Sequence, residues 1–423
     1  MSPAGAIGLA LVAAGAVAAL FWPFVGLLVY LWLDFMRPHD TYVELRALRP
    51  MLVVACATLA ATAWRERRHL LGSWRRFVPV ATLAAVVAAS VPVSVDGAQS
   101  AATLVEIGKM LALLWLFDRL VRSEQRLRAV LWVIVLSLAV LGVGAIMQAS
   151  ARDLLHEFQL GSVIEGPAGL GDGAFRDNND LARVLALSVP LWWVLAARRG
   201  ARWSRLVAGV GLLVGIAAIE CTFSRSGFLA LVVGIGVVAL SYRPLWRGAA
   251  LWLLFVVALL ALSPRAYVER VATLRAAPAD ASFRGRVDVW IDAWGLVQQR
   301  PLLGQGAGTF RSGAAGRPSA RRSSHNILLE VAVEIGLAGL AAYGWILLDT
   351  LWRLHRLRAA APAPWLGTAA VGIAAALLAY LTAGLALSRP FAAPLFVLVG
   401  LSLALQRCVH QSGNASGDVA SRV

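Results

Sequence analysis

His325 is a candidate catalytic group because it stands where a polar stretch gives way to a long apolar run. The run begins after Asn326 and predicts a helix, so the imidazole is expected at a helix N-terminus, where the dipole disfavours its protonated form. Arg321 and Arg322 act in the same direction. A neutral imidazole can accept a proton near neutral pH, as a general base must when it deprotonates an attacking hydroxyl. The alternative is a histidine that makes only structural hydrogen bonds.

Arginine side chains are abundant in the same polar stretch, residues 264–325, which holds ten arginines and four acids. Guanidinium groups bind phosphate in a bidentate manner. Arg284 and Arg286 belong to this stretch, and Arg225 lies in a tight turn where Ser226 can cap the next helix and leave N–H groups for an anion. These features predict a site for a diphosphate or another multiply charged anion. The alternatives are contact with anionic head groups for the stretch, and extension to the membrane interface for Arg225.

Charged residues also occur inside the apolar runs. Glu330 and Glu334 lie four residues apart after His325. Charges in such a run face the bundle interior or a wet cavity, so these carboxylates are expected either to bind arginine or backbone groups or to orient the base. Glu106 and Lys109, three residues apart, predict an internal ion pair.

Arg176 is a second-rank candidate for phosphate contact, since it stands just before a predicted helix start. The Asn and Asp residues beside it are good helix caps, which is the simpler role for them. No cluster of His, Cys and carboxylate residues has metal-ligand spacing, and the three cysteines form no CxxC pair. We therefore expect no metal and no cofactor, so arginines would have to offset the charge of a departing diphosphate.

Long apolar runs must position these residues. Hydrophobic residues make up 59% of the chain and charged residues 15%, whereas a soluble domain carries about a quarter charged residues. A helix needs ~20 apolar residues to span the hydrocarbon. The runs predict an all-α polytopic integral membrane protein with about twelve transmembrane helices, at residues 5–34, 48–64, 78–94, 101–121, 129–149, 178–197, 203–223, 226–242, 249–263, 326–352, 364–386 and 390–408.

Arginine in the short loops orients the chain, because Lys and Arg are retained on the cytoplasmic side. The clusters assigned to the cytoplasm lie at residues 65–76, 119–128, 198–205, 243–247 and 353–358. The stretches 150–177 and 264–325 then lie outside. Pro23 breaks the first run, so residues 5–34 cross once or twice, and both termini are cytoplasmic if they cross once. Because the basic residues are spread over many loops, the net charge of +16 does not indicate nucleic-acid binding.

The whole chain, residues 1–423, is expected to form a single transmembrane domain, with 264–325 as a large periplasmic loop inserted between spans. The polar end, residues 410–423, is expected to be a disordered cytoplasmic tail. Within the loop, residues 283–299 predict an amphipathic helix that lies on the membrane face or on the protein, because apolar side chains recur there at helical spacing. These side chains are Val287, Trp290, Ile291, Trp294 and Val297.

Several motifs together resemble the signature region of the O-antigen ligase and polymerase superfamily. They are Arg284-Gly285-Arg286 with Trp290 and Trp294, then Pro301-x-x-Gly304-x-Gly306 with Phe310, and His325-Asn326-x-x-Leu329-Glu330-x-x-x-Glu334-x-Gly336-x-x-Gly339. The turn Ser224-Arg225-Ser226-Gly227 resembles a turn between two spans of the same family. Near the N-terminus, Asp34-Phe35-Met36-Arg37-Pro38-His39 looks like a branch associated with exosortase systems, as in exosortase-associated O-glycosylation ligases.

The resemblance implies a membrane C-type glycosyltransferase fold in the bacterial inner membrane, with the active site facing the periplasm. It implies an O-antigen ligase that transfers a glycan from undecaprenyl pyrophosphate to an acceptor hydroxyl, on lipid A core, by metal-independent inverting transfer. Carried over by position, His325 would be the base, and Arg225, Arg284 and Arg286 would bind the donor pyrophosphate. Arg176, Asn326, Glu330, Arg321 and Arg322 are candidates of second rank.

Other functions remain open from the sequence. A polymerase of the same superfamily uses another glycan repeat as acceptor, and a protein O-oligosaccharyltransferase glycosylates pilin. A secondary transporter or flippase also contains intramembrane charges, although no pair of internal repeats of broken helices is recognisable in the sequence. The lipid bilayer and the lipid-linked glycan are the expected partners, with no nucleic acid.

Overall fold

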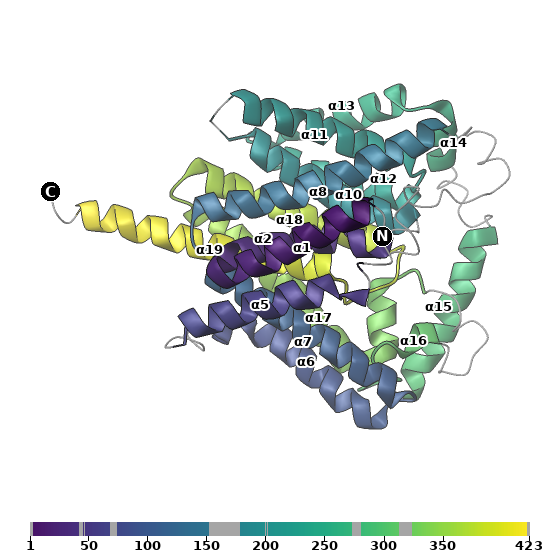
Figure 1. The fold of residues 1–423 in the computed structure, drawn as a ribbon. Helices are drawn as coiled ribbons and strands as arrows, with labels where there is room; N and C mark the ends of the chain where they lie inside the picture. Colours follow the sequence, from purple (N-terminus) through teal and green to yellow (C-terminus); the bar gives the residue numbers. More distant parts are fainter. Residues whose placement is uncertain are drawn as a thin grey trace.

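A computed structural model gives the arrangement of the chain (Figure 1). It describes residues 3–41, 45, 47–67, 74–151, 178–198, 200, 202–272, 281–312 and 324–420. Within these ranges the regular elements are helices, with no strand. The all-α fold predicted from the sequence is confirmed.

The first apolar run forms two helices. These are α1 (Pro3–Phe21) and α2 (Pro23–Met36). Pro23 occupies the first turn of α2, where its missing N–H breaks no helical hydrogen bond. Gly15 closely approaches Val29, and Gly26 closely approaches Ala19, so the two helices pack antiparallel as a hairpin (Figure 1). The run therefore turns back on itself, and the choice between one and two membrane crossings stays a prediction.

The remaining helices follow in chain order. In the first half they are α3 (Pro38–Thr41), α5 (Pro50–Arg65), α6 (Val78–Ser90), α7 (Gly97–Leu120) and α8 (Glu124–Ala151), with the 3-10 turns η1 (Trp74–Phe77) and η2 (Val91–Val93) flanking α6. In the second half they are α10 (Asn178–Ala196), α11 (Arg202–Cys221), α12 (Arg225–Ala239), α13 (Leu245–Leu262), α14 (Arg265–Ala272), α15 (Ala281–Gln299), α16 (Thr309–Ser312), α17 (Ile327–Ala360), α18 (Pro364–Gly384) and α19 (Ala393–Ala420).

Helix α10 is the centre of the bundle, where it packs against α8, α11, α12 and α18. Most of its side chains are buried, including that of Trp192. Gly211 of α11 packs against Trp192, and Gly372 of α18 packs against Val194, so glycine lets both neighbouring helices come close to α10. This central position carries polar side chains at the start of α10 into the interior of the protein.

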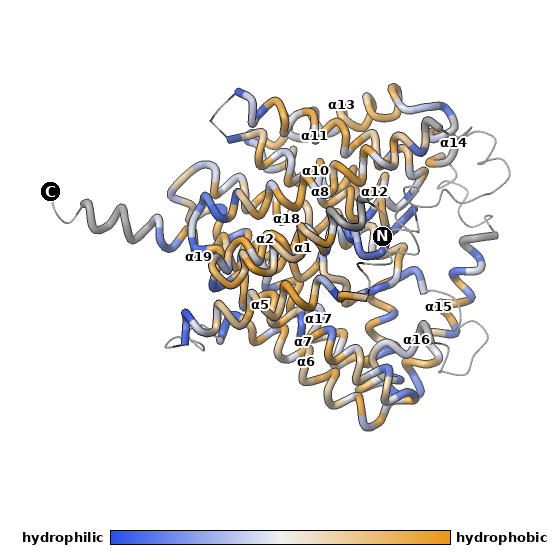
Figure 2. Tube along the Cα trace, in the orientation of Figure 1, coloured by the Kyte–Doolittle hydropathy of each residue, from blue (hydrophilic) through white to orange (hydrophobic). Residues whose placement is uncertain are grey.

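The helices have the lengths and hydropathy of membrane spans. Within the described residues, eight helices are long and apolar enough to cross a membrane, judged by length and composition. Shorter apolar helices lie at Gly8–Phe21, Pro23–Met36, Pro50–Arg65 and Arg225–Ala239. Figure 2 shows hydrophobic residues along the bundle and hydrophilic residues towards its ends. The chain is an all-α polytopic membrane protein, and the count of about twelve spans stays a prediction.

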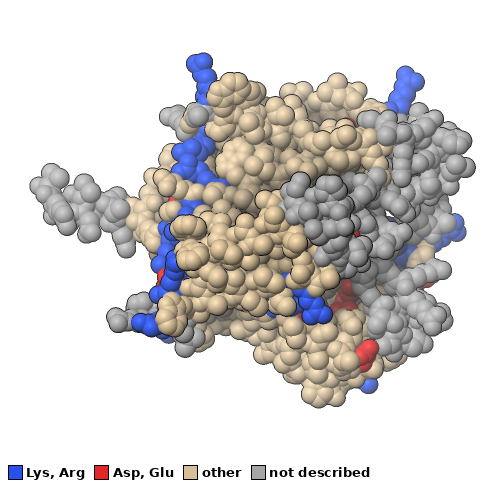
Figure 3. Space-filling model, viewed as in Figure 1, with Lys and Arg blue, Asp and Glu red and all other residues tan. Residues whose placement is uncertain are grey.

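The arginine clusters of the short loops meet at one end of the bundle, which we call the basic end; Figure 3 shows the band of Lys and Arg there, near the point where α19 leaves. The contacts that join neighbouring clusters are the Arg122–Glu66 ion pair (2.7 Å), the Arg198–Glu124 ion pair (4.0 Å) and a hydrogen bond from Arg358 to the Ser241 carbonyl (2.6 Å). The alternation of loops predicted from arginine agrees with this arrangement.

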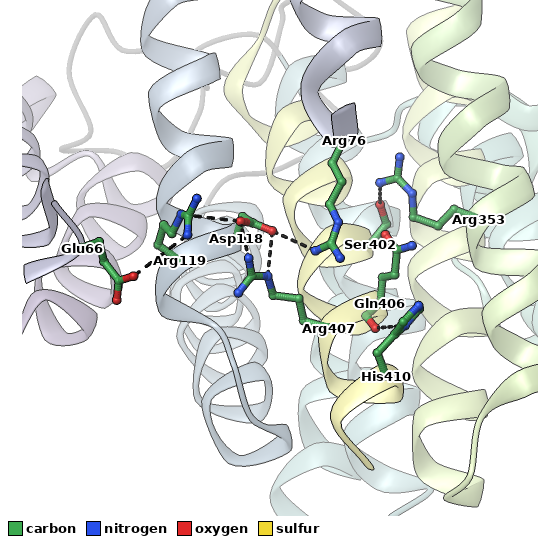
Figure 4. Close-up of polar contacts among 9 residues, drawn as sticks. All are labelled: Glu66, Arg76, Asp118, Arg119, Arg353, Ser402, Gln406, Arg407 and His410. Atoms are coloured by element: carbon green, nitrogen blue, oxygen red, sulfur yellow. Dashed lines mark hydrogen bonds and ion pairs between the residues drawn. The ribbon is translucent and has the colours of Figure 1, made fainter. Parts of the chain in front are cut away.

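A buried carboxylate, Asp118, organises the basic end (Figure 4). Arg407 of α19 donates two hydrogen bonds to its oxygens, of 2.8 and 2.7 Å, and Arg76 donates a third of 3.0 Å. Nearby, Arg353 of α17 donates to the Ser402 hydroxyl of α19 at 3.1 Å and also pairs with Asp349. These ion pairs and hydrogen bonds link η1, α7, α17 and α19 at their ends.

Helix α15 lies at the opposite end, which we call the α15 end (Figure 1). It corresponds to the amphipathic helix predicted at 283–299. Ile291 and Trp294 are 67% and 53% exposed. The buried stripe contains Val289, Ala293, Leu296 and Val297, which form a small core with Phe310, Ala332 and Val333. This stripe has the i, i+4, i+7 spacing of a buried helix face, whereas the prediction followed the large side chains on either side of it.

Helix α19 extends to Ala420, so residues 410–420 are helical where the sequence predicted a disordered tail. The segment contains no proline after Pro394, so no residue forces the helix to stop before its end.

Candidate functional site

The start of α17 is fixed by Asn326. Its side-chain oxygen accepts hydrogen bonds from the N–H groups of Leu328 and Leu329, at 3.1 and 3.2 Å, and thus satisfies donors that have no partner within the helix. His325, directly before this cap, has a φ of 48°, an uncommon left-handed conformation for a residue with a side chain. His325 therefore lies at the entrance of α17, as predicted, and Asn326 is its helix cap.

The loop that carries His325 is held by its backbone. The His325 N–H donates to the Ser388 hydroxyl at 3.3 Å, and the Ser324 and Ser388 hydroxyls are 3.3 Å apart. Glu330, 2% exposed, accepts hydrogen bonds from the Ser324 hydroxyl at 2.8 Å and from the Arg389 N–H at 3.4 Å. Glu330 thus joins the loop before α17 to the loop between α18 and α19.

A buried ion pair extends this cluster into α10. Arg183 donates to Asp180 at 2.9 Å and to the Ser388 carbonyl at 3.1 Å, and its guanidinium lies over the Tyr380 ring at 4.8 Å. Arg389 approaches the other Asp180 oxygen at 3.8 Å. Two guanidinium groups therefore share one carboxylate beside the His325 loop.

The turn with Arg225 borders the start of α10. Ser224 caps α12 by accepting a hydrogen bond from the Gly227 N–H at 3.1 Å, and its hydroxyl donates to the Asn179 side-chain oxygen at 2.7 Å. The cap is therefore Ser224, whereas the sequence predicted Ser226, because the helix already begins at Arg225. Arg225 accordingly occupies the first position of a helix, where N–H groups and the dipole favour an anion.

Aromatic rings enclose this turn. Tyr267 of α14 makes edge contacts with Phe223 and Phe228, with ring centroids 6.0 and 6.4 Å apart. Burial raises the pKa of the Tyr267 hydroxyl, and the charge of Glu220 acts in the same direction. The hydroxyl therefore stays neutral over the physiological pH range.

Helix α15 reaches the same loop through Trp290, whose ring N–H donates to the Ser324 carbonyl at 2.8 Å. Arg286 stands one helical turn before Trp290 and so lies on a neighbouring part of the same face. Arg284 is more exposed than Arg286. The α15 helix thus sets Arg286 towards the side of the His325 loop.

A glycine-rich turn supports this end of α17. Ile335 and Gly336 interrupt the helical conformation, and the turn at residues 301–306 fills the interruption. Its hydrogen bonds run from Leu337 N–H to the Pro301 carbonyl (2.7 Å), from Gln305 N–H to the Val333 carbonyl (2.8 Å) and from Gly306 N–H to the Glu334 carbonyl (2.8 Å). The turn supplies backbone partners that the kink removes from the helix.

A cavity of about 1200 Å³ adjoins the cluster. Its charged lining includes Asp34, Arg37, Asp180, Arg183, Glu330 and Arg389. His39 and Glu334 also line it. His325, Arg225, Arg284 and Arg286 are not among its described lining residues, although Glu330 and Arg389 connect the cavity wall directly to the His325 loop.

The structure brings some of the predicted site residues together and not others. His325, Asn326 and Glu330 lie together at the start of α17. Arg225, Arg284 and Arg286 lie on elements that border this cluster, and their contact with an anion stays a prediction. Arg176, Arg321 and Arg322 lie outside the described residues.

The cavity residues that were not singled out as site residues from the sequence include Asp180, Arg183 and Arg389. The signal for Arg183 was present, because an arginine inside an apolar run seldom faces lipid and Asp180 stands three residues before it. Arg389 gave no comparable signal, since a single arginine in a short loop is usual at a membrane boundary.

The fold and the charged cluster define a polytopic α-helical membrane protein with a cavity, lined in part by charged residues, near the α15 end. A family model described as O-Antigen ligase matches residues 210–344, from α11 to the middle of α17. This match supports the resemblance to the O-antigen ligase superfamily that the motifs predicted. This supports a ligase or polymerase type of function in general. No curated protein compared with the chain matches it.

Proposed function

We propose that the protein is an O-antigen ligase that transfers a glycan from undecaprenyl pyrophosphate to a hydroxyl of lipid A core. The transfer would take place at the α15 end, which faces the periplasm if the basic end is cytoplasmic. The main support is the hydrogen-bonded cluster in which Ser388 and Glu330 hold the His325 loop beside a cavity lined by charged residues. Such a cluster preorganises a reacting side chain, which lowers the cost of positioning it during the reaction.

In the proposed mechanism, His325 accepts the proton of the acceptor hydroxyl as the oxygen attacks the anomeric carbon of the donor sugar. The bond between that carbon and the diphosphate oxygen breaks, and undecaprenyl pyrophosphate leaves with the electron pair. Attack from the face opposite the leaving group inverts the configuration. Arg225, Arg284 and Arg286 would offset the charge of the leaving diphosphate.

The base assignment predicts that His325→Ala abolishes transfer while the protein still folds and inserts into the membrane. The variant should be purified, its monodispersity and melting temperature measured, and its transfer rate compared using lipid-linked oligosaccharide and lipid A core. His355→Ala, which changes a histidine near the opposite end of α17, is the matched control and should retain full activity. Transfer by His325→Ala at the wild-type rate would rule out this base.

The arginine assignment predicts that Arg225→Ala slows transfer by about tenfold or more at subsaturating donor, since one charge-assisted contact to phosphate is lost. The melting temperature should change little. The same assay carried out with a chelator should give the wild-type rate, because no step of the proposed mechanism uses a metal ion. A rate that collapses with the chelator and returns with a divalent cation would contradict that part of the proposal.

A polymerase or a protein O-oligosaccharyltransferase would use the same donor, and the family match covers ligase and polymerase types alike. The acceptor distinguishes them. A deletion strain without the ligase accumulates long chains on undecaprenyl pyrophosphate, whereas a strain without the polymerase retains single repeats. Purified protein offered lipid A core, lipid-linked repeats and pilin in parallel would identify the acceptor directly.

A further inference from the structure

A second cavity, of about 360 Å³, lies at the basic end of the bundle, and we call it the basic-end pocket. Trp132 from α8, Leu195 from α10 and Ser204 from α11 line it. Helices α8 and α11 both begin beside the pocket, with Gln125 and Ser204 in their first turns. Two helix dipoles therefore present their positive ends there, far from the His325 loop.

The charge of this pocket is of one sign. Its described lining residues include two arginines, Arg128 and Arg198, and no acid. The larger cavity differs, because acids such as Glu106 line it. Glu106 pairs with Lys109 at 2.6 Å; the sequence predicted this pair as internal, and the structure shows the two side chains 56% and 50% exposed. The basic-end pocket thus favours an anion, whereas the larger cavity holds charges of both signs.

The two guanidinium groups have donors to offer. The Glu124 carboxylate lies 3.6 Å from Nε of Arg128 and 4.0 Å from Nε of Arg198, which is too far for hydrogen bonds. Nε of Arg128 donates at 3.3 Å to the Glu124 backbone carbonyl. The terminal nitrogens of both arginines have no hydrogen-bond acceptor among the described residues. Two guanidinium groups beside one carboxylate leave a net positive charge with donors for an anion.

Trp132 adds a neutral donor to the lining. Its ring packs edge-on against Trp192, with ring centroids 5.8 Å apart, and its N–H has no acceptor within the described part of the chain. An indole N–H can only donate. The pocket therefore combines charged and neutral donors, as an anionic oxygen group requires.

An exposed apolar stripe continues from the pocket along α8. Leu136, Val140 and Val143 follow Trp132 on the same helix face and are 46%, 57% and 43% exposed. From Trp132 to Val143 the helix rises by about 16 Å, close to the ~15 Å of hydrocarbon in one leaflet of a bilayer. A molecule with its charged group in the pocket can therefore lay a hydrocarbon chain along α8 within one leaflet.

We infer that the basic-end pocket binds the phosphate group of an anionic phospholipid from the surrounding membrane, with an acyl chain along the α8 stripe. Arg128 of α8 and Arg198, just before α11, contact the phosphate oxygens. Basic pockets between transmembrane helices suit anionic head groups. The lipid joins the starts of α8 and α11 through these contacts. The inference is independent of the proposed function, because the pocket lies at the other end of the bundle.

A soluble phosphate compound would use the same arginines but not the apolar stripe. Trp203, 74% exposed at the start of α11, also favours a lipid, because tryptophan is enriched at the boundary between membrane and water. The pocket thus lies at the level where phospholipid head groups occur. We therefore assign it to a lipid, and the experiments below distinguish the two sources of phosphate.

Removing either guanidinium tests the inference. In native mass spectrometry of the purified protein, Arg128→Gln and Arg198→Gln should each weaken the tightest binding step of phosphatidylglycerol by about fivefold or more. Arg75→Gln and Arg247→Gln remove the same charge from exposed positions of the basic end outside the lining. Binding by these controls should stay within about twofold of wild type. Equal binding by all four variants, whether weakened or not, would overturn the inference.

Two comparisons use the unaltered protein. Phosphatidylcholine with the same acyl chains should bind about fivefold or more weakly than phosphatidylglycerol, because it has no net charge. Equal binding of the two lipids would contradict recognition of an anion. Inorganic phosphate and glycerol phosphate should displace the lipid no better than chloride at the same ionic strength. Specific displacement would assign the pocket to a soluble phosphate compound and overturn the lipid assignment.

Melting temperatures show whether the variants fold. Phosphatidylglycerol should raise the melting temperature of wild type and of Arg75→Gln more than that of Arg128→Gln, since a ligand that binds only the folded state stabilises it. An equal rise in all three would count against the pocket. If Arg128→Gln fails to fold, cross-linking of the unaltered protein decides. Phosphatidylglycerol with a photoreactive group near its head group should then label peptides from the starts of α8 and α11, and labelling confined to other helices would overturn the inference.

Discussion

Two neighbouring loops of the site each contain a non-glycine residue whose backbone has the left-handed conformation. His325 has a φ of 48° and Arg389 a φ of 75°. Such conformations are maintained only where the surroundings determine them, and they are frequent at functional sites. Here Glu330 bonds to Ser324 and to the Arg389 N–H, and Ser388 bonds to the His325 N–H, so each strained residue is held through its own backbone or its neighbour.

Glu330→Gln is predicted to lower the transfer rate by about tenfold, because the amide keeps one acceptor oxygen for two donors and loses the charge. The protein should remain folded. The maximal rate and the binding of undecaprenyl pyrophosphate should be measured separately; only the rate should fall if Glu330 positions the loop. Glu269→Gln changes an exposed acid on α14 and should have no effect. A normal rate in Glu330→Gln would contradict a positioning role.

The sequence identifies some of these residues and not others, for physical reasons. Glu330 was recognisable because a carboxylate in an apolar run must find a polar partner. Its partners, Ser388 and Arg389, were not recognisable, because they lie about sixty residues away in a loop that gives no local signal. Asn326 was chosen for its place in a motif, and the structure shows its use as a helix cap.

At the scale of elements, the kink of α17 and the turn at 301–306 form one unit. Gly336 has φ 68° and ψ −170°, a combination that is essentially restricted to glycine, and a Cβ there would collide with the Leu302 backbone. Glycine at this position is therefore required by backbone geometry as well as by space. The Gly304 and Gly306 residues of the turn also have positive φ, of 66° and 116°.

Gly336→Ala is predicted to destabilise the protein by about 2 kcal/mol or more and to abolish transfer, because the turn can no longer dock into the kink. Gly344→Ala, two turns further along α17, is the matched control, since nothing lies within 4 Å of the added methyl group. The control should be as stable as wild type or slightly more stable. Melting temperatures in detergent measure both, and equal values would show that the kink tolerates a side chain.

The positions of α15 and α17 in the chain were predictable, but the way they pack was not. Apolar spacing gave the helix at 283–299, yet two of its large residues proved exposed. The spacing of apolar residues identifies the buried face of a helix only when those residues are confined to one face. Helix α15 carries apolar side chains on more than one face. The insertion of the turn into α17 depends on contacts between residues about thirty positions apart.

The whole molecule has two polar ends of different character. At the basic end, ion pairs around Asp118 tie helices together, whereas at the α15 end the charges line a cavity and hold a histidine loop. The basic end was predictable from the arginine loops alone. The number of spans was not, because α1, α2, α5 and α12 are shorter than a typical span and α10 is surrounded by other helices.

Asp118→Ala is predicted to destabilise the protein by about 3 kcal/mol, because it leaves Arg76 and Arg407 without the carboxylate that they share in a partly buried site. Transfer by the fraction that remains folded should be close to normal, since the residue lies at the end of the bundle away from the cavity mouth. Asp288→Ala, at an exposed position of α15, should leave the melting temperature unchanged. Equal melting temperatures for the two variants would contradict the role given to the network.

The interrupted helix α17 also has a consequence for biogenesis. Its 34 residues would measure about 51 Å as one helix, longer than the ~30 Å of hydrocarbon, so part of the helix must extend beyond the bilayer. The carbonyl groups of Val333 and Glu334 accept hydrogen bonds from Gln305 and Gly306, in a turn that is synthesised earlier. The kinked start of α17, and with it the histidine loop, can therefore take its final form only where it meets this earlier turn.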